Sequence, residues 1–215
     1  MTFVALDHLT PASGDVVDAV ARLGHHVSLG RGAELYSQDD TAECVYRVVR
    51  GIVRTSRITD DGRRQIGGFY YPGDMIALED ETAHCFSAEA LTDCEAIVVQ
   101  RRLLDAAAST DPTVARQLWI AGTRCMRKMQ SHLVQLGRKS ALERVCAVLS
   151  ELSARGAGEE IDLPMSRQDI ADYLDLTIET VSRMFSQLQA RRVIAMTGLR
   201  RVRVSDPCAL ERLAA

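Results

Sequence analysis

The sequence predicts an α+β protein in which a β-barrel of the jelly-roll kind, a long helix and a winged helix-turn-helix follow one another. Three patterns predict this order. Short strand-like runs extend from about Val27 to Val99, a helical stripe follows Pro112, and two capped helical segments precede two short strands between Ser166 and Val204. We place the boundaries at 1–110 for the barrel, 111–137 for the long helix and 138–215 for the last domain.

The barrel prediction rests on runs such as "ECVYRVVRGIVRTSRI" and "FSAEALTDCEAIVV", which are rich in β-branched residues. In the first run Val45, Arg47 and Val49 share one face of a strand, so apolar and polar residues alternate imperfectly. Turn residues separate the runs at Gly51, Asp61-Gly62, Pro72-Gly73 and Asp93. Several short strands at this spacing favour a small β-barrel or jelly roll.

The long helix begins at Pro112 and carries a narrow apolar stripe. Its members recur at spacings of three and four and are Val114, Leu118, Ala121, Cys125, Met129, His132 and Leu136. A stripe of this kind packs either against the protein's own core or against a second helix, and its length and narrowness favour a second helix. Gly137 is the expected break before the last domain.

The next two helices are predicted from their caps. In "LPMSRQDIADYLD", Ser166 with Asp169 three residues later has the form of a capping box, after Pro164. Asp175 and Leu176 form a tight turn, and Thr177 is the expected N-cap of the second helix. Two short helices joined by such a turn form a helix-turn-helix, whose second helix enters the major groove of DNA.

The second helix has two faces. Val181, Phe185 and Leu188 form its apolar stripe, and the opposite face carries Glu179, Ser182, Arg183 and Ser186. In an ordinary surface helix Glu179 and Arg183 would merely pair with each other. In a groove, the carboxylate can accept a hydrogen bond from cytosine N4, the guanidinium can donate to guanine O6 and N7, and Ser182 can bond to either kind of base. We expect these three residues to read bases.

Other polar residues are predicted to contact the DNA backbone. Two short strands around Thr197-Gly198 form a hairpin wing that is rich in arginine. Side chains near the positive ends of the two helices suit phosphate oxygens as well. The expected backbone contacts are Arg167, Gln168, Thr177, Thr180, Arg200 and Arg201.

The stretch "MSRQDIADYLDLTIETVSR" resembles the DNA-binding signature of the Crp/Fnr superfamily of bacterial transcription regulators, and its E-x-x-S-R spelling is similar to the FixK-like branch. The resemblance covers nearly the whole chain. It implies a cyclic-nucleotide-binding-like β-barrel as sensor, a long dimerisation helix and a winged helix-turn-helix. It further implies an activator that reads TTGA-type half-sites in an inverted repeat, with RNA polymerase as a partner. A two-fold operator favours a parallel homodimer along the long helix.

The barrel is not expected to bind cyclic AMP. The segment "YYPGDMIALED" resembles the phosphate-binding segment of cyclic-nucleotide sensors, whose phosphate is paired by an arginine. In "HCFSAEA", Phe86 stands where that arginine would be. A buried phosphate without a cation has nothing to offset its lost hydration.

No cofactor or metal site is expected from the cysteine pattern. The sequence holds six cysteines, with none in residues 1–43 and no C-x-x-C pair, whereas cluster ligation needs several close thiolates. We expect the scattered cysteines to be reduced thiols that pack as small buried side chains. Haem ligation by His84 or Cys85 stays open, so an effector-dependent regulator that senses haem, gas or redox state is the alternative. Two copies of Cys125 could also face each other across the dimer axis as a redox switch, although an inert packed thiol is the expectation.

Composition fits a cytoplasmic protein with two modest domains. The 215 residues carry a net charge of −3 and 47% hydrophobic residues, and no secretory or membrane segment is visible. The net charge does not decide DNA binding, because the local arginine cluster is what DNA would meet. A β-barrel enzyme acting on small molecules is the alternative of another class, but it leaves Ser166–Arg183 unexplained. We therefore expect no enzyme and no membrane partner, with palindromic double-stranded DNA and a second copy of the chain as partners.

Overall fold

The computed structural model describes residues 20–79, 82–155 and 160–214. Its N-terminal part contains two four-stranded antiparallel sheets. The first orders β1 (His25–Leu29), β8 (Cys94–Gln100), β3 (Cys44–Arg50) and β6 (Met75–Ile76). The second orders β2 (Glu34–Tyr36), β7 (Ser87–Ala90), β4 (Val53–Ile58) and β5 (Arg64–Tyr70). Non-sequential neighbours such as β8 beside β3 give the crossed connections of a jelly roll.

The two sheets enclose one apolar core. Val48 of β3 and Val53 of β4 are both fully buried there, together with small residues of β7. Alternation along β3 turns Val45 to the outer face, where it packs with Leu104 and Val114 from the helices that follow. The predicted β-rich domain is thereby confirmed, and helices cover one of its outer faces.

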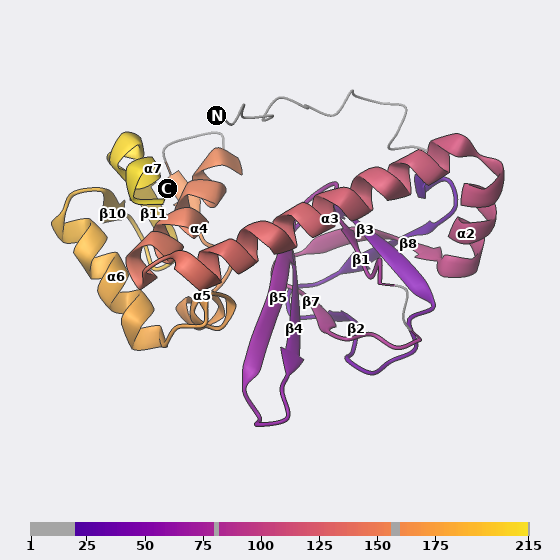
Figure 1. The fold of residues 1–215 in the computed structure, drawn as a ribbon, viewed down its shortest axis with the longest axis horizontal. Helices are drawn as coiled ribbons and strands as arrows, with labels where there is room; N and C mark the ends of the chain where they lie inside the picture. Colours follow the sequence, from indigo (N-terminus) through magenta and orange to yellow (C-terminus); the bar gives the residue numbers. More distant parts are fainter. Residues whose placement is uncertain (1–19, 80–81, 156–159, 215) are drawn as a thin grey trace.

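Those covering helices are α2 (Arg101–Thr110) and α3 (Pro112–Arg138). Asp111 caps α3 by accepting a hydrogen bond of 2.8 Å from the backbone N–H of Thr113, and Pro112 occupies the first turn, where no donor is needed. Figure 1 shows α3 running from the barrel to the C-terminal domain. The helix continues through Gly137 and ends at Arg138, because Lys139 is extended. The break therefore lies just after the predicted hinge.

The C-terminal domain contains α4 (Ala141–Arg155), α5 (Arg167–Leu174), α6 (Ile178–Ala190) and α7 (Pro207–Ala214). A three-stranded sheet in the order β10 (Ile194–Met196), β11 (Arg201–Val204), β9 (Glu160–Asp162) completes it. The sequence predicts a wing of two strands only. The third strand escapes that prediction because β9 is three residues long and lies far from the hairpin in sequence.

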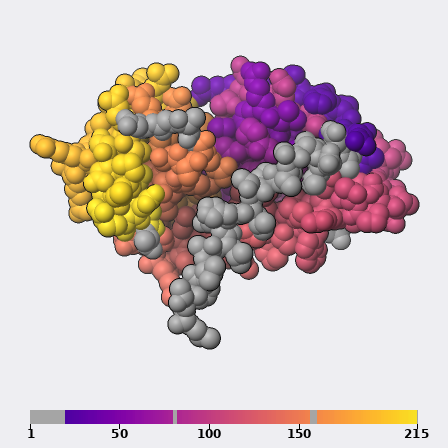
Figure 2. Space-filling view, turned by 90° about the horizontal axis from the view of Figure 1, so that it is seen from above, coloured from indigo at the N-terminus to yellow at the C-terminus, as the bar shows by residue number. Residues whose placement is uncertain are grey.

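The two domains adjoin directly. In the space-filling view the orange and yellow C-terminal domain lies against the purple barrel (Figure 2), and α5 contacts β5. Within the described residues, no helix is long and apolar enough to cross a membrane. The α+β architecture with a winged helix-turn-helix is confirmed.

Candidate nucleic-acid interface

The first helix of the pair, α5, is fixed by its cap. Ser166 Oγ accepts a hydrogen bond from the backbone N–H of Asp169, and Asp169 Oδ2 accepts one of 2.8 Å from the backbone N–H of Ser166. The predicted capping box is confirmed. At the other end Asp175 adopts φ 52°, a left-handed conformation that reverses the chain in a tight turn. The direction of the next helix follows from these two ends.

The second helix, α6, begins at the predicted cap. Thr177 Oγ1 accepts a hydrogen bond of 3.2 Å from the backbone N–H of Thr180. Val181, Phe185 and Leu188 are buried in the domain core, as their spacing predicts. Glu179, Ser182, Arg183 and Ser186 are exposed on the opposite face. The three residues predicted to read bases therefore share one solvent-facing surface.

The charged groups on this surface do not pair with each other. Among the described residues Glu179 forms no ion pair, and Arg183 makes a single long hydrogen bond of 3.4 Å from Nη2 to Thr180 Oγ1. An ordinary surface helix would pair a glutamate and an arginine one turn apart. Both groups are instead available to a ligand that presents hydrogen-bonding edges.

Three of the residues predicted to contact phosphates lie in the first turn or at the N-cap of a helix. Thr177 and Thr180 lie at the N-terminal end of α6, where backbone donors and the helix dipole favour anions. Gln168 is exposed in the first turn of α5, and its amide donates a hydrogen bond of 2.6 Å to Asp172. Thr177 and Gln168 are exposed, and Thr180 is half-buried.

Arg167 behaves differently from its prediction. Its guanidinium carbon lies 3.0 Å from the ring centroid of Phe185 in α6, and Nη2 contacts the sulfur of Met196 at 3.4 Å. Burial lowers the pKa of Arg167 to about 10. In this conformation Arg167 packs α5 against α6 and the wing, and its side chain would have to turn outward before it could contact a phosphate.

The net positive charge of the wing is smaller than its arginines alone would give. Strand β9 brings acids alongside the arginines of β11, so that Arg201 pairs with Asp162 at 2.9 Å and Arg203 with Glu160 at 2.8 Å. These pairs are exposed, and exposed pairs contribute only about 0–1 kcal/mol, so a phosphate could replace either carboxylate. Arg200 is exposed and donates a hydrogen bond of 3.4 Å to the backbone carbonyl of Pro164.

The long helix α3 has two apolar faces. The inner face contacts the protein's own domains: Val114 is 3% exposed and packs with Leu118 against the barrel. His132 stacks on Tyr173 of α5 with ring centroids 4.1 Å apart. Cys125 is half-buried on this side, and burial raises the pKa of its thiol. The two remaining members of the predicted stripe, Ala121 and Leu136, are half-buried as well.

The outer face of α3 carries a second stripe that the sequence reasoning missed. Of the predicted dimer residues only Met129, which is 61% exposed, belongs to it. The large apolar side chains that remain exposed there are Trp119, Ile120, Met126, Met129, Leu133 and Val134. Trp119, Met126 and Leu133 are spaced by sevens, as in a paired helix. Val114 and Leu118 of the predicted contact set are already covered by the protein's own barrel, whereas the outer stripe is exposed.

The barrel interior is occupied by aromatic side chains near the segment compared with nucleotide sensors. His84 is 2% exposed, stacks on Tyr36 with centroids 3.7 Å apart, and places Nδ1 3.1 Å from Glu79 Oε1. Phe86 lies beneath the guanidinium of Arg57, which is 5.9 Å from the ring centroid. The sequence reasoning missed Arg57, because it comes from another strand. Within the described residues, no group of three or more His, Cys, Asp or Glu side chains could hold a metal ion.

Comparisons with known proteins agree with this architecture. The family described as "Crp-like helix-turn-helix domain" matches residues 143–213, and "Cyclic nucleotide-binding domain" matches residues 26–111. The chain is 43% identical to the nitrogen fixation regulation protein FixK of Azorhizobium caulinodans, over 90% of this chain and 81% of that protein. It is 34% identical to the transcriptional activator protein Anr of Pseudomonas protegens, over 93% and 84%. The solved structure of FixK2 from Bradyrhizobium japonicum aligns with a TM-score of 0.83 and 41% identity, covering 89% of this chain and 98% of that one.

Proposed function

The chain belongs to the Crp/Fnr family of DNA-binding transcription regulators, and from this premise we propose that it activates transcription as a homodimer bound to an inverted repeat of TTGA-type half-sites. The observation that carries the proposal is the exposed face of α6, on which Glu179 and Arg183 are unpaired with each other. Its relatives are regulators and not enzymes. RNA polymerase is the partner that an activator requires.

Readout of the half-site divides among three side chains. Arg183 donates to guanine O6 and N7, which specifies the G of TTGA. Glu179 accepts a hydrogen bond from the N4 amino group of the cytosine on the facing strand. Because the surrounding phosphates repel a carboxylate, Glu179 favours binding mainly where this cytosine is present. Ser182 supplies a shorter contact between them. Thr177, Thr180 and Gln168 fix the register through phosphates.

Dimerisation uses the outer stripe of α3. An exposed apolar stripe along a helix of 27 residues is unusual for a monomer in water. A parallel pairing of two such helices buries Trp119, Met126 and Leu133 and relates the two α6 helices by a two-fold axis. An inverted repeat in DNA has the same symmetry.

Regulation does not require cyclic AMP or an iron–sulfur cluster. The stacked rings of Tyr36 and His84 are buried in the barrel, and Phe86 stands where the phosphate-pairing arginine of a cyclic-nucleotide sensor would be. The cysteines are spread over separate parts of the fold. The amount of protein then determines how much operator is occupied.

A second candidate is an effector-dependent regulator of the same family, and Arg57 is the observation that favours it. Its guanidinium lies over Phe86, and its Nε is buried without a hydrogen-bond partner among the described residues. A half-buried cation of this kind could pair with an anionic effector. Ligation of haem by His84 is a poorer fit, because its ring already stacks on Tyr36 and its Nδ1 bonds to Glu79.

Selection of bound DNA from a random pool by freshly purified protein tests both candidates. We expect a symmetric TTGA-type repeat to be enriched with no cofactor added, and a visible absorption spectrum without haem or cluster bands. Enrichment of an asymmetric or unrelated sequence would contradict the proposed readout. Enrichment that appears only with cyclic AMP, and disappears in Arg57→Gln, would establish the second candidate instead.

A further inference from the structure

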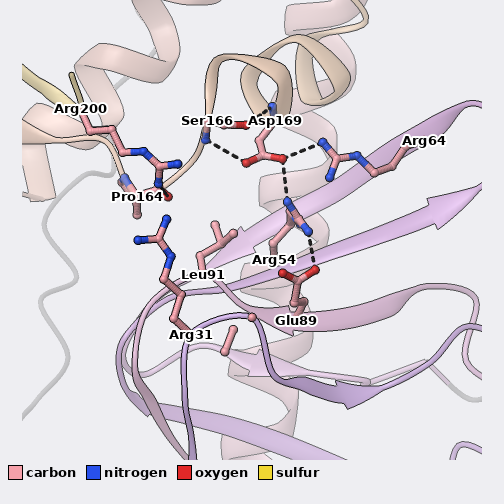
Figure 3. A pocket seen from close by; sticks show the side chains of 11 residues that line it. Arg31, Arg54, Arg64, Glu89, Leu91, Pro164, Ser166, Asp169 and Arg200 are labelled. Carbon is pink, nitrogen blue, oxygen red and sulfur yellow. Dashed lines mark hydrogen bonds and ion pairs between the residues drawn. The ribbon is translucent and has the colours of Figure 1, made fainter.

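One carboxylate of the DNA-binding domain is buried against the sensor barrel. Asp169, in the first turn of α5, is 5% exposed, and Arg54 of β4 is 7% exposed. Figure 3 shows Arg54 and Arg64 reaching from the barrel strands toward Asp169. Arg54 Nη1 lies 2.6 Å and Arg64 Nη2 2.7 Å from the same oxygen, Asp169 Oδ1.

The two oxygens of Asp169 serve different domains. Oδ2 accepts the backbone N–H of Ser166 and closes the helix cap, whereas Oδ1 accepts both arginines of the barrel. Burial alone would raise the pKa of Asp169, but the Ser166 hydrogen bonds and the two guanidinium groups hold it below its ordinary value. The start of α5 and the barrel therefore share one charged group.

Further contacts fix the orientation of α5 relative to the barrel. Arg64 Nε donates a hydrogen bond of 2.7 Å to Asp172, one turn along α5, so Arg64 bonds to two turns of that helix. Arg54 Nη2 bonds at 2.5 Å to Glu89, which fixes Arg54 from the barrel side. Planar guanidinium groups with several fixed partners resist rotation better than single contacts do.

Aromatic stacking joins the same helix to α3. Tyr173 of α5 stacks on His132 of α3 and meets Phe69 of β5 edge-on, with ring centroids 5.2 Å apart. Helix α5 is thus held by the barrel and by the long helix at once. On its other side α5 packs on α6 through Ile170, Ala171 and Leu174, and Figure 1 shows α5 between the barrel and α6.

We propose that Arg54 and Arg64 are positioning residues for DNA reading: through Asp169 and Asp172 they hold α5, and with it α6, at a fixed angle to α3. The inference rests on the proposed dimeric reading of an inverted repeat. If the angle is fixed in each protomer, the distance between the two α6 helices is fixed in the dimer. The sensor barrel then sets which half-site spacing the protein accepts.

The test compares operators whose half-site spacing is correct, one base pair longer and one base pair shorter. Arg64→Ala is the principal variant, since Arg54 still pairs with Asp169 and keeps that carboxylate from being left alone. Arg63→Ala is its matched control, because Arg63 is the neighbouring arginine and, among the described residues, its ion pair is a local one with Asp61. Binding to a duplex with a single half-site measures base reading by one α6 helix, independently of the distance between half-sites.

The wild-type protein and Arg63→Ala should prefer the correct spacing sharply. Arg64→Ala should bind the correct operator about tenfold more weakly and lose most of the preference over the altered spacings, while its binding to a single half-site stays unchanged. Arg54→Lys, which keeps the charge, should fall between Arg64→Ala and the wild type. A merely structural loss would weaken all four duplexes alike, so this pattern separates positioning from folding.

Two further results would overturn the inference. If Arg64→Ala discriminates spacing as sharply as Arg63→Ala, the arginines do not position the reading helix, and the proposed function stands. If the wild-type protein itself shows no spacing preference while binding single half-sites, the dimeric reading fails and the inference fails with it.

Discussion

Truncation of Leu133 on the outer stripe of α3 should weaken the dimer by a factor that follows from its exposure. Leu133 is 66% exposed in the protomer. Leu133→Ala removes three carbon atoms, each worth about 0.8 kcal/mol when taken fully out of water, so about 1.6 kcal/mol is lost per copy at this exposure. In the proposed dimer two copies meet at the axis, which brings the loss to about 3 kcal/mol and raises the dimer dissociation constant on the order of a hundredfold.

Analytical ultracentrifugation over a dilution series measures that constant directly. Ile58→Ala is the matched control: it also removes three carbon atoms from an exposed residue, which is 56% exposed at the end of β4 and lies off the stripe. We expect Ile58→Ala to dimerise as the wild type does. A dissociation constant for Leu133→Ala within about threefold of the wild type would refute the assignment of the outer stripe, since that is under about 1 kcal/mol.

Three further outcomes are expected. In mobility-shift titrations, Arg183→Ala should cost about 1–3 kcal/mol of binding free energy on the best operator and weaken the preference for guanine. Arg201→Ala should instead weaken binding to all sequences alike and reduce the slope of log affinity against log salt by about one. If Arg183→Ala keeps its sequence discrimination, the proposed docking is excluded. Insertion of about five base pairs between half-sites should abolish tight binding, because the half-sites then face opposite sides of the duplex, and unchanged affinity would mean that protomers bind independently. Burial lowers the pKa of His132 below its ordinary value of 6.5, so near this pH the unfolded chain binds more protons than the folded one. The free energy of unfolding should therefore fall as the pH drops through and below 6.5. In urea unfolding, His132→Phe should show a weaker pH dependence than the wild type, and an equal slope in both proteins would rule His132 out as its source.

Local chemistry makes the helix-turn-helix predictable from sequence. Ser166 and Asp169 form the expected box, Thr177 caps α6, and the apolar spacing of Val181, Phe185 and Leu188 gives its buried face. Each of these signals acts within one or two helical turns, so a short stretch of sequence contains all of its partners. The exposed face with Glu179 and Arg183 follows from the same periodicity.

Features that depend on distant partners are not predictable in this way. Helix α3 has two apolar stripes, and periodicity cannot tell which one faces the barrel, so the sequence prediction assigns Val114 outward although it is buried. The acid of β9 that pairs with Arg201 lies 39 residues away from it, and the pair of Arg54 and Asp169 spans 115 residues. Sequence spacing gives no indication of such contacts, because they form only when the domains pack together.

The outer stripe of α3 also bears on how sharply the regulator responds. If a protomer must first find its twin through that stripe, dimers at low abundance increase as the square of the protomer concentration. Operator occupancy then rises steeply over a narrow range of synthesis rates, without any bound signal. Side chains such as Trp119, 74% exposed in the protomer, would set where that range lies by setting the strength of the pairing. In such a protein, the strength of pairing between two long helices sets the protein level at which the regulated genes respond.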